Sequence, residues 1–268
     1  MLSICLSSRI RNNPSSNLKR FLDSLDNFTK NDEKDKIEIL IKFDNDDIIP
    51  EFVLNSEYPF PIKYFQYERG EGRWDIANVL NFLITMVDEK CKFIMNIADD
   101  FVIDKYFLTD LLKIDEYSII GGASWAHPYG KEYDPGKRNL YMKPPLGVDP
   151  RNIDHWGYSI GAYAPIFGRK LMLSTGCNVL INSVDFYFVS LALEIYNKHG
   201  LNIWKDFHNF YDRIESYNAS RKKCYNPLDY PANDGGFLSS EYERRYFEIV
   251  SSQATNIYLN MKNQNVGT

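Results

Sequence analysis

The sequence predicts an α/β fold in which a mixed, mostly parallel central sheet is flanked by helices. Between residues 3 and 121, short runs of β-forming residues alternate with segments whose apolar residues recur at helical spacing. Repeated strand–helix–strand units of this kind form parallel sheets with right-handed crossovers. Several of the strand runs are continuously apolar, which is typical of strands covered on both faces. With 268 residues, 44% of them hydrophobic, the chain can bury a sizeable core.

The first half of the chain supplies five expected strands. They span residues 3–7, 37–43, 62–67, a run that begins at Phe93, and 117–121. After the first strand, Ser15 or Ser16 can cap a helix that carries four apolar residues on one face: Leu18, Phe21, Leu22 and Leu25. A second helix is expected from Trp74, and a short one over residues 106–112.

The second half begins with a long segment, residues 127–154, that is rich in Gly, Pro, Tyr and charge. A connection of that length is usually a functional loop or a lid. A strand is then expected over residues 156–167, with a helix from Gly168 to Leu173. A further helix should run from Ser183 to Lys198 and stop at Gly200, before a last strand over residues 201–204.

Composition limits the class of protein. A formal net charge of −5 disfavours nucleic-acid binding, which needs a basic face. The four cysteines are far apart without metal-type spacing, so we expect free thiols in a reducing compartment. The first residues read as a strand rather than a signal peptide, and no window has the length of a membrane span. We therefore expect a cytoplasmic protein, at most peripheral to a membrane.

Two adjacent carboxylates, Asp99 and Asp100, end the apolar run that begins at Phe93. In open α/β sheets, ligands bind in the crevice outside the carboxyl ends of the strands. Two acids at such a point repel each other unless a cation or a ligand with hydroxyl donors meets them. Carboxylate oxygens suit Mg²⁺ or Mn²⁺ bound together with substrate phosphates. The alternative is a solvated turn after a strand.

Other polar residues are expected at the same edge. The first strand ends in Ser7, Ser8 and Arg9, and the second ends in Asp44. The segment 69–75 leads into the next helix on that side, with Arg69, Arg73 and two glycines that allow close backbone approach. Carboxylates for a metal and arginines for phosphate indicate a nucleoside diphosphate bridged by a divalent ion.

The order of these motifs resembles that of the nucleotide-sugar glycosyltransferases of GT-A fold, in particular the inverting, family-2-like type. The resemblance covers about residues 1–206. It rests on the first strand and turn at residues 4–9, on Asp44, on Gly70 to Asn78, and on Ala98-Asp99-Asp100. Two later motifs also match, Phe167-Gly168-Arg169-Lys170-Leu171-Met172 and Ser183-Val184-Asp185-Phe186-Tyr187.

The resemblance implies a role for each matching residue. Ser7, Arg9 and Asp44 would contact the nucleotide, with its base near Ser7 and Asp44. Asp99 would contact the ribose, and Arg69 and Arg73 the phosphates. Asp100 would hold Mn²⁺ or Mg²⁺, with His208 as a later ligand. Asp185 would be the general base that deprotonates the acceptor hydroxyl, and Trp156 would stack on the acceptor sugar.

The resemblance also implies the domain organisation and the partners. Residues 1–216 would form the glycosyltransferase domain, with a nucleotide-binding half over about 1–124 and an acceptor half over about 125–216. Residues 217–268 are polar and dotted with aromatic residues, and from this composition we expect an extension that wraps the domain, with about its last ten residues disordered. The donor would be a nucleotide-diphosphate sugar, and the acceptor a glycan, a lipid-linked molecule or another hydroxyl compound.

Several alternatives stay open at this point. Ala98 stands where many members have a further acid, and Asp185 does not follow a glutamate. Asp185 could cap its helix instead, in which case a retaining route or another acid such as Asp154 would apply. His208 could be a surface histidine, and Trp156 a core residue. The other functions considered are a nucleotidyltransferase that makes nucleotide sugars and a non-catalytic sugar-binding module of the same fold.

Overall fold

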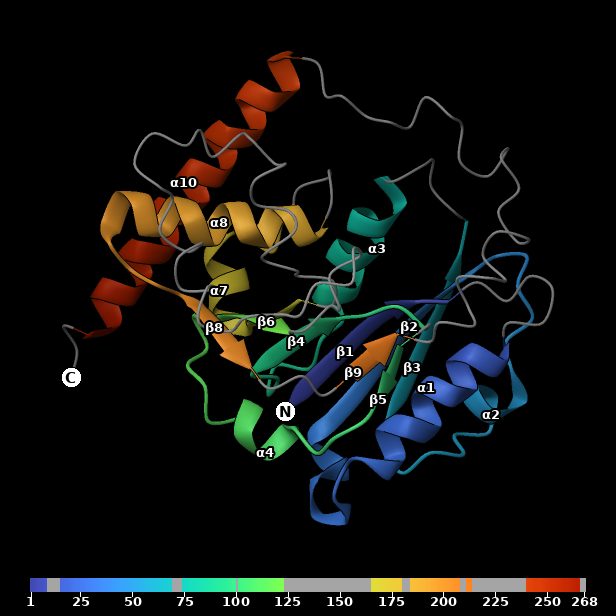
Figure 1. Cartoon of the computed structure of the whole chain (residues 1–268). Coiled ribbons are helices and arrows are strands. Elements are labelled where there is room, and N and C mark those ends of the chain that lie inside the picture. The colour runs from blue at the N-terminus through green and yellow to red at the C-terminus, as the bar shows by residue number, and fades with distance from the viewer. Residues whose placement is uncertain are drawn as a thin grey trace, which may run out of the picture.

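A mixed sheet lies at the centre of the computed structural model, which describes residues 1–8, 15–68, 74–99, 101–122, 165–179, 184–207, 211–213 and 240–265 (Figure 1). Within these ranges seven strands have the order β3-β2-β1-β4-β7-β6-β8. Their bounds are β1 Leu2–Ser7, β2 Ile37–Asp44, β3 Ile62–Tyr67, β4 Phe93–Asn96, β6 Ile119–Gly122, β7 Ile166–Gly168 and β8 Trp204–Phe207. A second sheet pairs β5 (Phe101–Ile103) with β9 (Tyr211–Arg213).

The strands of the main sheet are mostly parallel, as the sequence predicted. β1 pairs in parallel with both β2 and β4, β2 with β3, and β6 with β8. β7 pairs antiparallel with β4 and β6, and it is the strand of the described sheet that runs against the others. The carboxyl ends of β1, β2, β3 and β4 therefore open on one edge.

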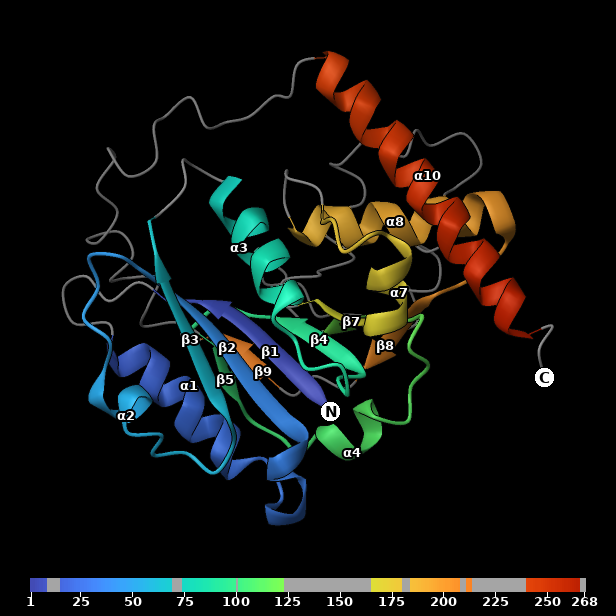
Figure 2. The ribbon, with the colours of Figure 1, turned by 180° about the vertical axis from the view of Figure 1, so that it is seen from behind.

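Helices cover both faces of the sheet (Figures 1 and 2). One face packs against α1 (Ser15–Asn27), α2 (Glu51–Leu54), α4 (Leu108–Leu111) and the small sheet. The other packs against α3 (Trp74–Thr85), α7 (Arg169–Ser174), α8 (Val184–His199) and α10 (Ser240–Asn265). A short 3₁₀ helix, Asn31–Lys36, precedes β2. The two faces of β1, β2, β4, β6 and β7 thus belong to two separate hydrophobic cores.

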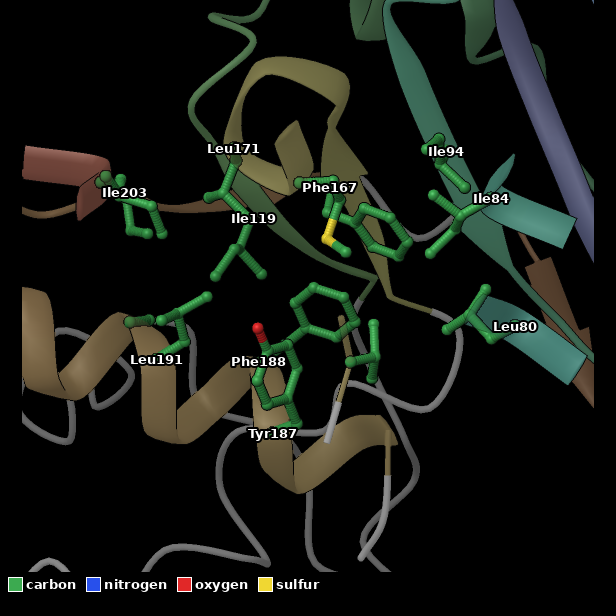
Figure 3. Close-up of a cluster of buried hydrophobic side chains, with 14 of the residues drawn as sticks. Leu80, Ile84, Ile94, Ile119, Phe167, Leu171, Tyr187, Phe188, Leu191 and Ile203 are labelled. Carbon is green, nitrogen blue, oxygen red and sulfur yellow. The ribbon is translucent and has the colours of Figure 1, made fainter. Parts of the chain in front are cut away.

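The alternation of side chains along β1 and β2 explains this division. Ile4 and Ile39 point to the core beneath α1, whereas Cys5 and Leu40 point to the core beneath α3. In α1, the four apolar residues that predicted a helix are all buried. Figure 3 shows the second core, where Phe188 of α8 stacks on Phe167 of β7 with ring centroids 4.4 Å apart.

Two glycines are required where helices begin and end. Gly168 joins β7 to α7, and a Cβ there would lie 1.8 Å from the carbonyl oxygen of Glu116. A larger residue would therefore force the two segments apart. Gly200 ends α8 with a φ of +67° and donates its backbone N–H to the carbonyl of Tyr196. This is the glycine stop that the sequence predicted.

Three of the cysteines lie in the described part of the chain, and these are free thiols. Cys5 and Cys91 are buried, and burial raises the pKa of Cys91 to about 11. Both thiols therefore stay protonated near neutral pH and pack as small apolar groups. Cys224 lies outside the described residues.

The C-terminal part contains a long helix where we expected a surface extension with a disordered end. Residues 240–265 form α10, which packs against α7 and α8 (Figure 2), so the chain is helical almost to its end. It buries Tyr246, Val250, Ala254 and Ile257 in the core beneath α3 and α8. These residues are spaced by four, four and three positions, which is helical periodicity. The boundary at residues 216 and 217 stays a prediction.

We predict that α10 contributes to the stability of the whole fold. Ile257→Ala should lower the free energy of unfolding by about 2–5 kcal/mol, because it opens a cavity at a fully buried position. Ile249→Ala is the matched control on the same helix, since Ile249 is 41% exposed. Urea unfolding of both variants measures the difference. Equal, small losses would mean that α10 is only loosely attached.

Candidate functional site

Polar residues gather where β1, β2 and β4 end, and we call them the strand-end cluster: Ser7, Ser8, Lys42, Asp44, Asp47 and Asp99. Parallel pairing brings them together. Ser7 is opposite Lys42 in the β1–β2 register, and Asp44 is opposite Tyr67 in the β2–β3 register. All of them except Ser7 are buried. Burying this many charged groups at a sheet edge is costly unless their partners are fixed.

Asp99 is held by the end of β1. Beyond β4, the backbone N–H of Ile97 still donates to the carbonyl of Cys5 at 3.2 Å, so the chain continues beside β1. Ser8 then donates its hydroxyl to Asp99 Oδ2 at 2.7 Å, with both residues buried. A hydrogen bond to an ionised acceptor is stronger than a neutral one. The first and fourth strand ends therefore meet, as the sequence predicted.

Asp44 is held by a buried lysine of its own strand. Lys42 Nζ lies 2.5 Å from Asp44 Oδ1, and the two side chains are only 1% and 7% exposed. The same ammonium lies 4.8 Å from the centroid of the Tyr67 ring on β3, in a cation–π arrangement. Residues two apart on a strand share a face, which is why Lys42 reaches Asp44.

The turn after Asp44 is fixed by its own side chains. The Asp44 backbone N–H donates to Asp47 Oδ2 at 3.0 Å, and the Asp47 N–H donates to the Asp44 carbonyl at 3.1 Å. Gln66 Nε2 on β3 donates to the carbonyl oxygens of Asp44 and Asp47, at 3.1 and 2.8 Å. The carboxylate at the end of β2 is thus held in place before any ligand arrives.

Ser8 connects these two arrangements. Its hydroxyl donates to Asp99, and its backbone N–H donates to the carbonyl of Lys42 at 2.9 Å. The ends of β1, β2 and β4 are therefore linked by hydrogen bonds into one unit. Carboxylates arranged in this way can accept hydrogen bonds from hydroxyl or N–H groups, or bind a hard cation.

Part of this arrangement was predicted from the sequence. Asp44 and Asp99 were expected at one edge, and the structure brings the ends of their strands together through Ser8. Lys42 was missed, although a lysine inside an otherwise apolar strand, two residues before an acid, is a signal for a buried pair. The roles predicted for Ser7, Asp44 and Asp99 toward a ligand stay predictions.

The remaining predicted residues cannot be placed in the same way. Arg9, Arg69, Arg73, Asp100, Trp156 and His208 lie outside the described residues. Asp185 is the second residue of α8, but its side chain is also outside the described part. Because α8 begins at Val184, Asp185 lies within the first turn of this helix. A carboxylate there is stabilised by the positive end of the helix dipole.

A divalent metal is compatible with the residues at this edge. Asp99 supplies a buried carboxylate, which is the type of ligand that Mg²⁺ and Mn²⁺ prefer. Over the described ranges, no three His, Cys, Asp or Glu side chains form a group that could hold a metal. A complete ligand set would therefore have to include residues beyond those ranges, such as Asp100 and His208.

The fold is similar to that of S. aureus TarS. One TarS structure covers 91% of this chain with a TM-score of 0.51 and 14% sequence identity. Another, of TarS 1-349 in complex with UDP, covers the whole chain with a TM-score of 0.51 and 12% identity. This chain spans 42% of the longer TarS chain and 92% of the shorter one. At this level of identity the likeness concerns the fold.

Comparison at the level of sequence gives no further relation. No family model and no curated protein matches the chain. Within the described residues, no helix combines the length and the apolar character needed to span a bilayer.

We predict that the buried Lys42–Asp44 pair is essential for the stability of this edge. Lys42→Met should lower the free energy of unfolding by about 3–5 kcal/mol, because it takes the cation away from a buried carboxylate. Adding Asp44→Asn should restore part of the loss. Lys113→Met is the matched control, since its pair with Asp110 is largely exposed and is worth at most about 1 kcal/mol. Similar losses in Lys42→Met and Lys113→Met would contradict a structural role for the buried pair.

Proposed function

We propose that this protein is a glycosyltransferase of GT-A type, which moves a sugar from a nucleotide-diphosphate sugar to an acceptor hydroxyl. The observation that carries the proposal is the strand-end cluster, in which buried acids at the carboxyl ends of parallel strands are held by Ser8 and Lys42. The carboxyl edge is where open α/β sheets bind ligands. The fold is similar to that of TarS, which was also solved in complex with UDP, and UDP is what a transferase leaves after taking the sugar from a UDP-sugar.

The chemistry of the cluster favours the nucleoside part of such a donor. A carboxylate accepts hydrogen bonds from ribose hydroxyls and from the N–H of a base, but it repels phosphate. In this proposal Asp44 and Ser7 contact the base or its ribose, and Asp99 accepts hydrogen bonds from the ribose. The pairing of Asp44 with Lys42 and of Asp99 with Ser8 supports these roles, because it orients both carboxylates in advance.

Positively charged groups must bind the diphosphate. The strand-end cluster has more acidic than basic side chains, so these groups must come from elsewhere. Arg9, Arg69 and Arg73 follow or precede the elements at this edge in the sequence, so they are the proposed phosphate ligands. Asp100 and His208 are the proposed protein ligands of Mn²⁺ or Mg²⁺. When bound, such an ion would neutralise charge on the diphosphate.

For the transfer step we propose a single displacement with Asp185 as general base. The acceptor hydroxyl attacks the anomeric carbon, and its proton moves to the Asp185 carboxylate. The new C–O bond forms as the bond between the anomeric carbon and the diphosphate oxygen breaks, which inverts the configuration. The nucleoside diphosphate leaves with the electron pair. The position of Asp185 in the first turn of α8 supports this role, since α8 packs on the sheet through buried residues such as Tyr187 and Phe188, next to this position.

The acceptor side of the proposal rests on the sequence. Trp156 would stack on the face of an acceptor sugar, and the domain would extend to about residue 216. A glycan, a lipid-linked molecule or another hydroxyl compound would serve as acceptor.

We predict that UDP binding depends on a divalent cation. Calorimetric titration of UDP should give an affinity in Mn²⁺ at least about tenfold higher than in excess chelator, a difference of about 1.4 kcal/mol. Asp100→Asn should abolish that difference while the fold is kept. Equal UDP affinities with Mn²⁺ and with chelator would remove the metal from the proposal.

We predict that Asp44 contributes directly to nucleotide affinity. Because Asp44 pairs with Lys42, the test uses the double variant Lys42→Met/Asp44→Asn, which removes both charges together. UDP binding should weaken by about 1–3 kcal/mol, the cost of leaving a buried donor on the ligand unsatisfied. The control is Lys113→Met/Asp110→Asn, which makes the same exchange at an exposed pair. Unchanged UDP affinity in the first variant would confine Asp44 to a structural role.

We predict that Asp185→Asn slows sugar transfer by about 10²–10⁴-fold, the usual contribution of a general base. Asparagine keeps the shape of the side chain but cannot take a proton at neutral pH. UDP affinity should stay unchanged, and the free energy of unfolding should fall by at most about 1 kcal/mol, the value of a carboxylate in a first helical turn. The rate is measured as release of UDP from candidate UDP-sugars with acceptor. A variant that transfers sugar at the wild-type rate would exclude Asp185 as the base and favour a retaining route.

A further inference from the structure

One polar side chain interrupts the apolar face by which α10 packs on the domain. Gln253 is 5% exposed and lies among Val250, Ala254 and Ile257 on that face. Burying an amide costs free energy unless its oxygen and its N–H groups are satisfied. The partners of Gln253 therefore indicate why α10 carries a glutamine at this position.

The Gln253 amide makes three hydrogen bonds to two different segments. Tyr187 of α8 donates its hydroxyl to Gln253 Oε1 at 3.0 Å. Gln253 Nε2 donates to the carbonyl oxygens of Thr175 and Asn178, at 3.2 and 3.0 Å. Tyr187 is fully buried, and this burial raises the pKa of its phenol, so the hydroxyl keeps its proton and acts as the donor.

Both segments lie close in sequence to the proposed general base, Asp185. Tyr187 lies two residues after Asp185, in the first turn of α8. Thr175 and Asn178 belong to the chain between α7 and α8. The first turn of a helix lacks partners for its backbone N–H groups and frays readily, so its position depends on tertiary contacts. Gln253 supplies such contacts to the first turn and to the segment before it.

The same segment is also fixed from its other side. Asn81 of α3 donates Nδ2 to the carbonyl of Val179 at 3.0 Å, and the Val179 N–H donates back to Asn81 Oδ1 at 2.8 Å. Residues 175–179 are thus held between α10 and α3. Figure 2 shows α10 crossing α8 and passing beside α7, while α3 lies to the left, past one end of α8. The side-chain amides of Gln253 and Asn81 both bind this segment, so the segment links α10 to α3, the helix that follows Arg73 in the sequence.

We propose that Gln253 is a positioning residue, through which α10 sets the orientation of the first turn of α8 and of Asp185 within it. The consequence for catalysis rests on the proposed function, whereas the structural effect does not. Displacing a catalytic group by about 1 Å can cost about 10²-fold in rate. α10 is then part of the catalytic machinery, although it lies far along the chain from the other proposed site residues.

The test compares three single variants of the full chain. Gln253→Met keeps length and apolar packing but loses all three hydrogen bonds. Tyr187→Phe loses the phenol hydroxyl and keeps the bonds of Gln253 to Thr175 and Asn178. Asn256→Met is the control, because it makes a similar change at an exposed position of α10. Amide hydrogen exchange over residues 175–190, UDP affinity, and kcat and KM for transfer are measured for each.

Gln253→Met should raise exchange over residues 175–190 at least about tenfold and lower kcat at least about tenfold. UDP affinity and the KM for the donor should stay within about twofold of wild type, because the strand-end cluster is untouched. Tyr187→Phe should give a smaller effect of the same kind, and Asn256→Met none. In the double variant Gln253→Met/Tyr187→Phe, the loss in kcat, expressed as free energy, should be smaller than the sum of the two single losses, because the two residues share one hydrogen bond.

Unchanged exchange in both Gln253→Met and Tyr187→Phe would overturn the proposal. Raised exchange with an unchanged kcat would also overturn it, since Asp185 would then not depend on Gln253. If Gln253→Met does not fold, the same two measurements on Tyr187→Phe, amide hydrogen exchange and kcat, decide whether the proposal holds. Should the wild type neither bind UDP nor release it from any donor, the proposed function fails, and the exchange data alone decide whether Gln253 fixes the first turn of α8.

Discussion

The pairing of β1 with β2 on one side and with β4 on the other is the constraint on which the site depends. Parallel pairing places the residues after all three strands at one edge, and the register sets Ser7 opposite Lys42. Ser8 then donates to Lys42 through its backbone and to Asp99 through its hydroxyl. A shift of one residue in β1 would turn Ile4 and Leu6 out of their core and separate these groups.

The strand-end cluster shows how a protein keeps charge at a buried edge. Three carboxylates lie there, and each one has a fixed partner in the fold: Asp44 pairs with Lys42, Asp47 accepts from the Asp44 backbone N–H, and Asp99 accepts from Ser8. An apolar edge would be more stable, because buried pairs seldom repay their loss of hydration. The retention of such groups where ligands bind to α/β sheets is consistent with a binding role.

Much of the sheet and its flanking helices could be predicted from local pattern. The bounds of β3 agree with the sequence to the residue, and α1 and α8 lie where apolar spacing and a glycine stop indicated. Local pattern works there because burial dictates the residue type. Local pattern did not predict α10, because most of its residues are polar and its apolar stripe is narrow. That stripe packs on α8, which is a contact between segments far apart in the sequence. The strand predicted over residues 201–204 begins only at Trp204 and runs to Phe207, because these are the residues that pair with β6.

The sequence predicted which strand ends form the candidate site, but not the side chains with which Asp44 and Asp99 pair. Acids after Phe43 and Ala98 are visible in the sequence, and the parallel topology brings their strands together. The pairing of Asp99 with Ser8 depends on the path of the chain beyond β4, and that of Asp44 with Lys42 on the burial of a lysine that composition would place at the surface. Neither follows from residue type alone.

The proposed function requires that a nucleoside diphosphate binds at the carboxyl edge of β1, β2 and β4. The decisive measurement is a crystal structure of the protein with UDP and Mn²⁺. We expect the nucleoside within hydrogen-bonding distance of Asp44 and Asp99, and the diphosphate directed away from these carboxylates toward the metal. UDP bound at the opposite edge of the sheet, or remote from both aspartates, would contradict the claim.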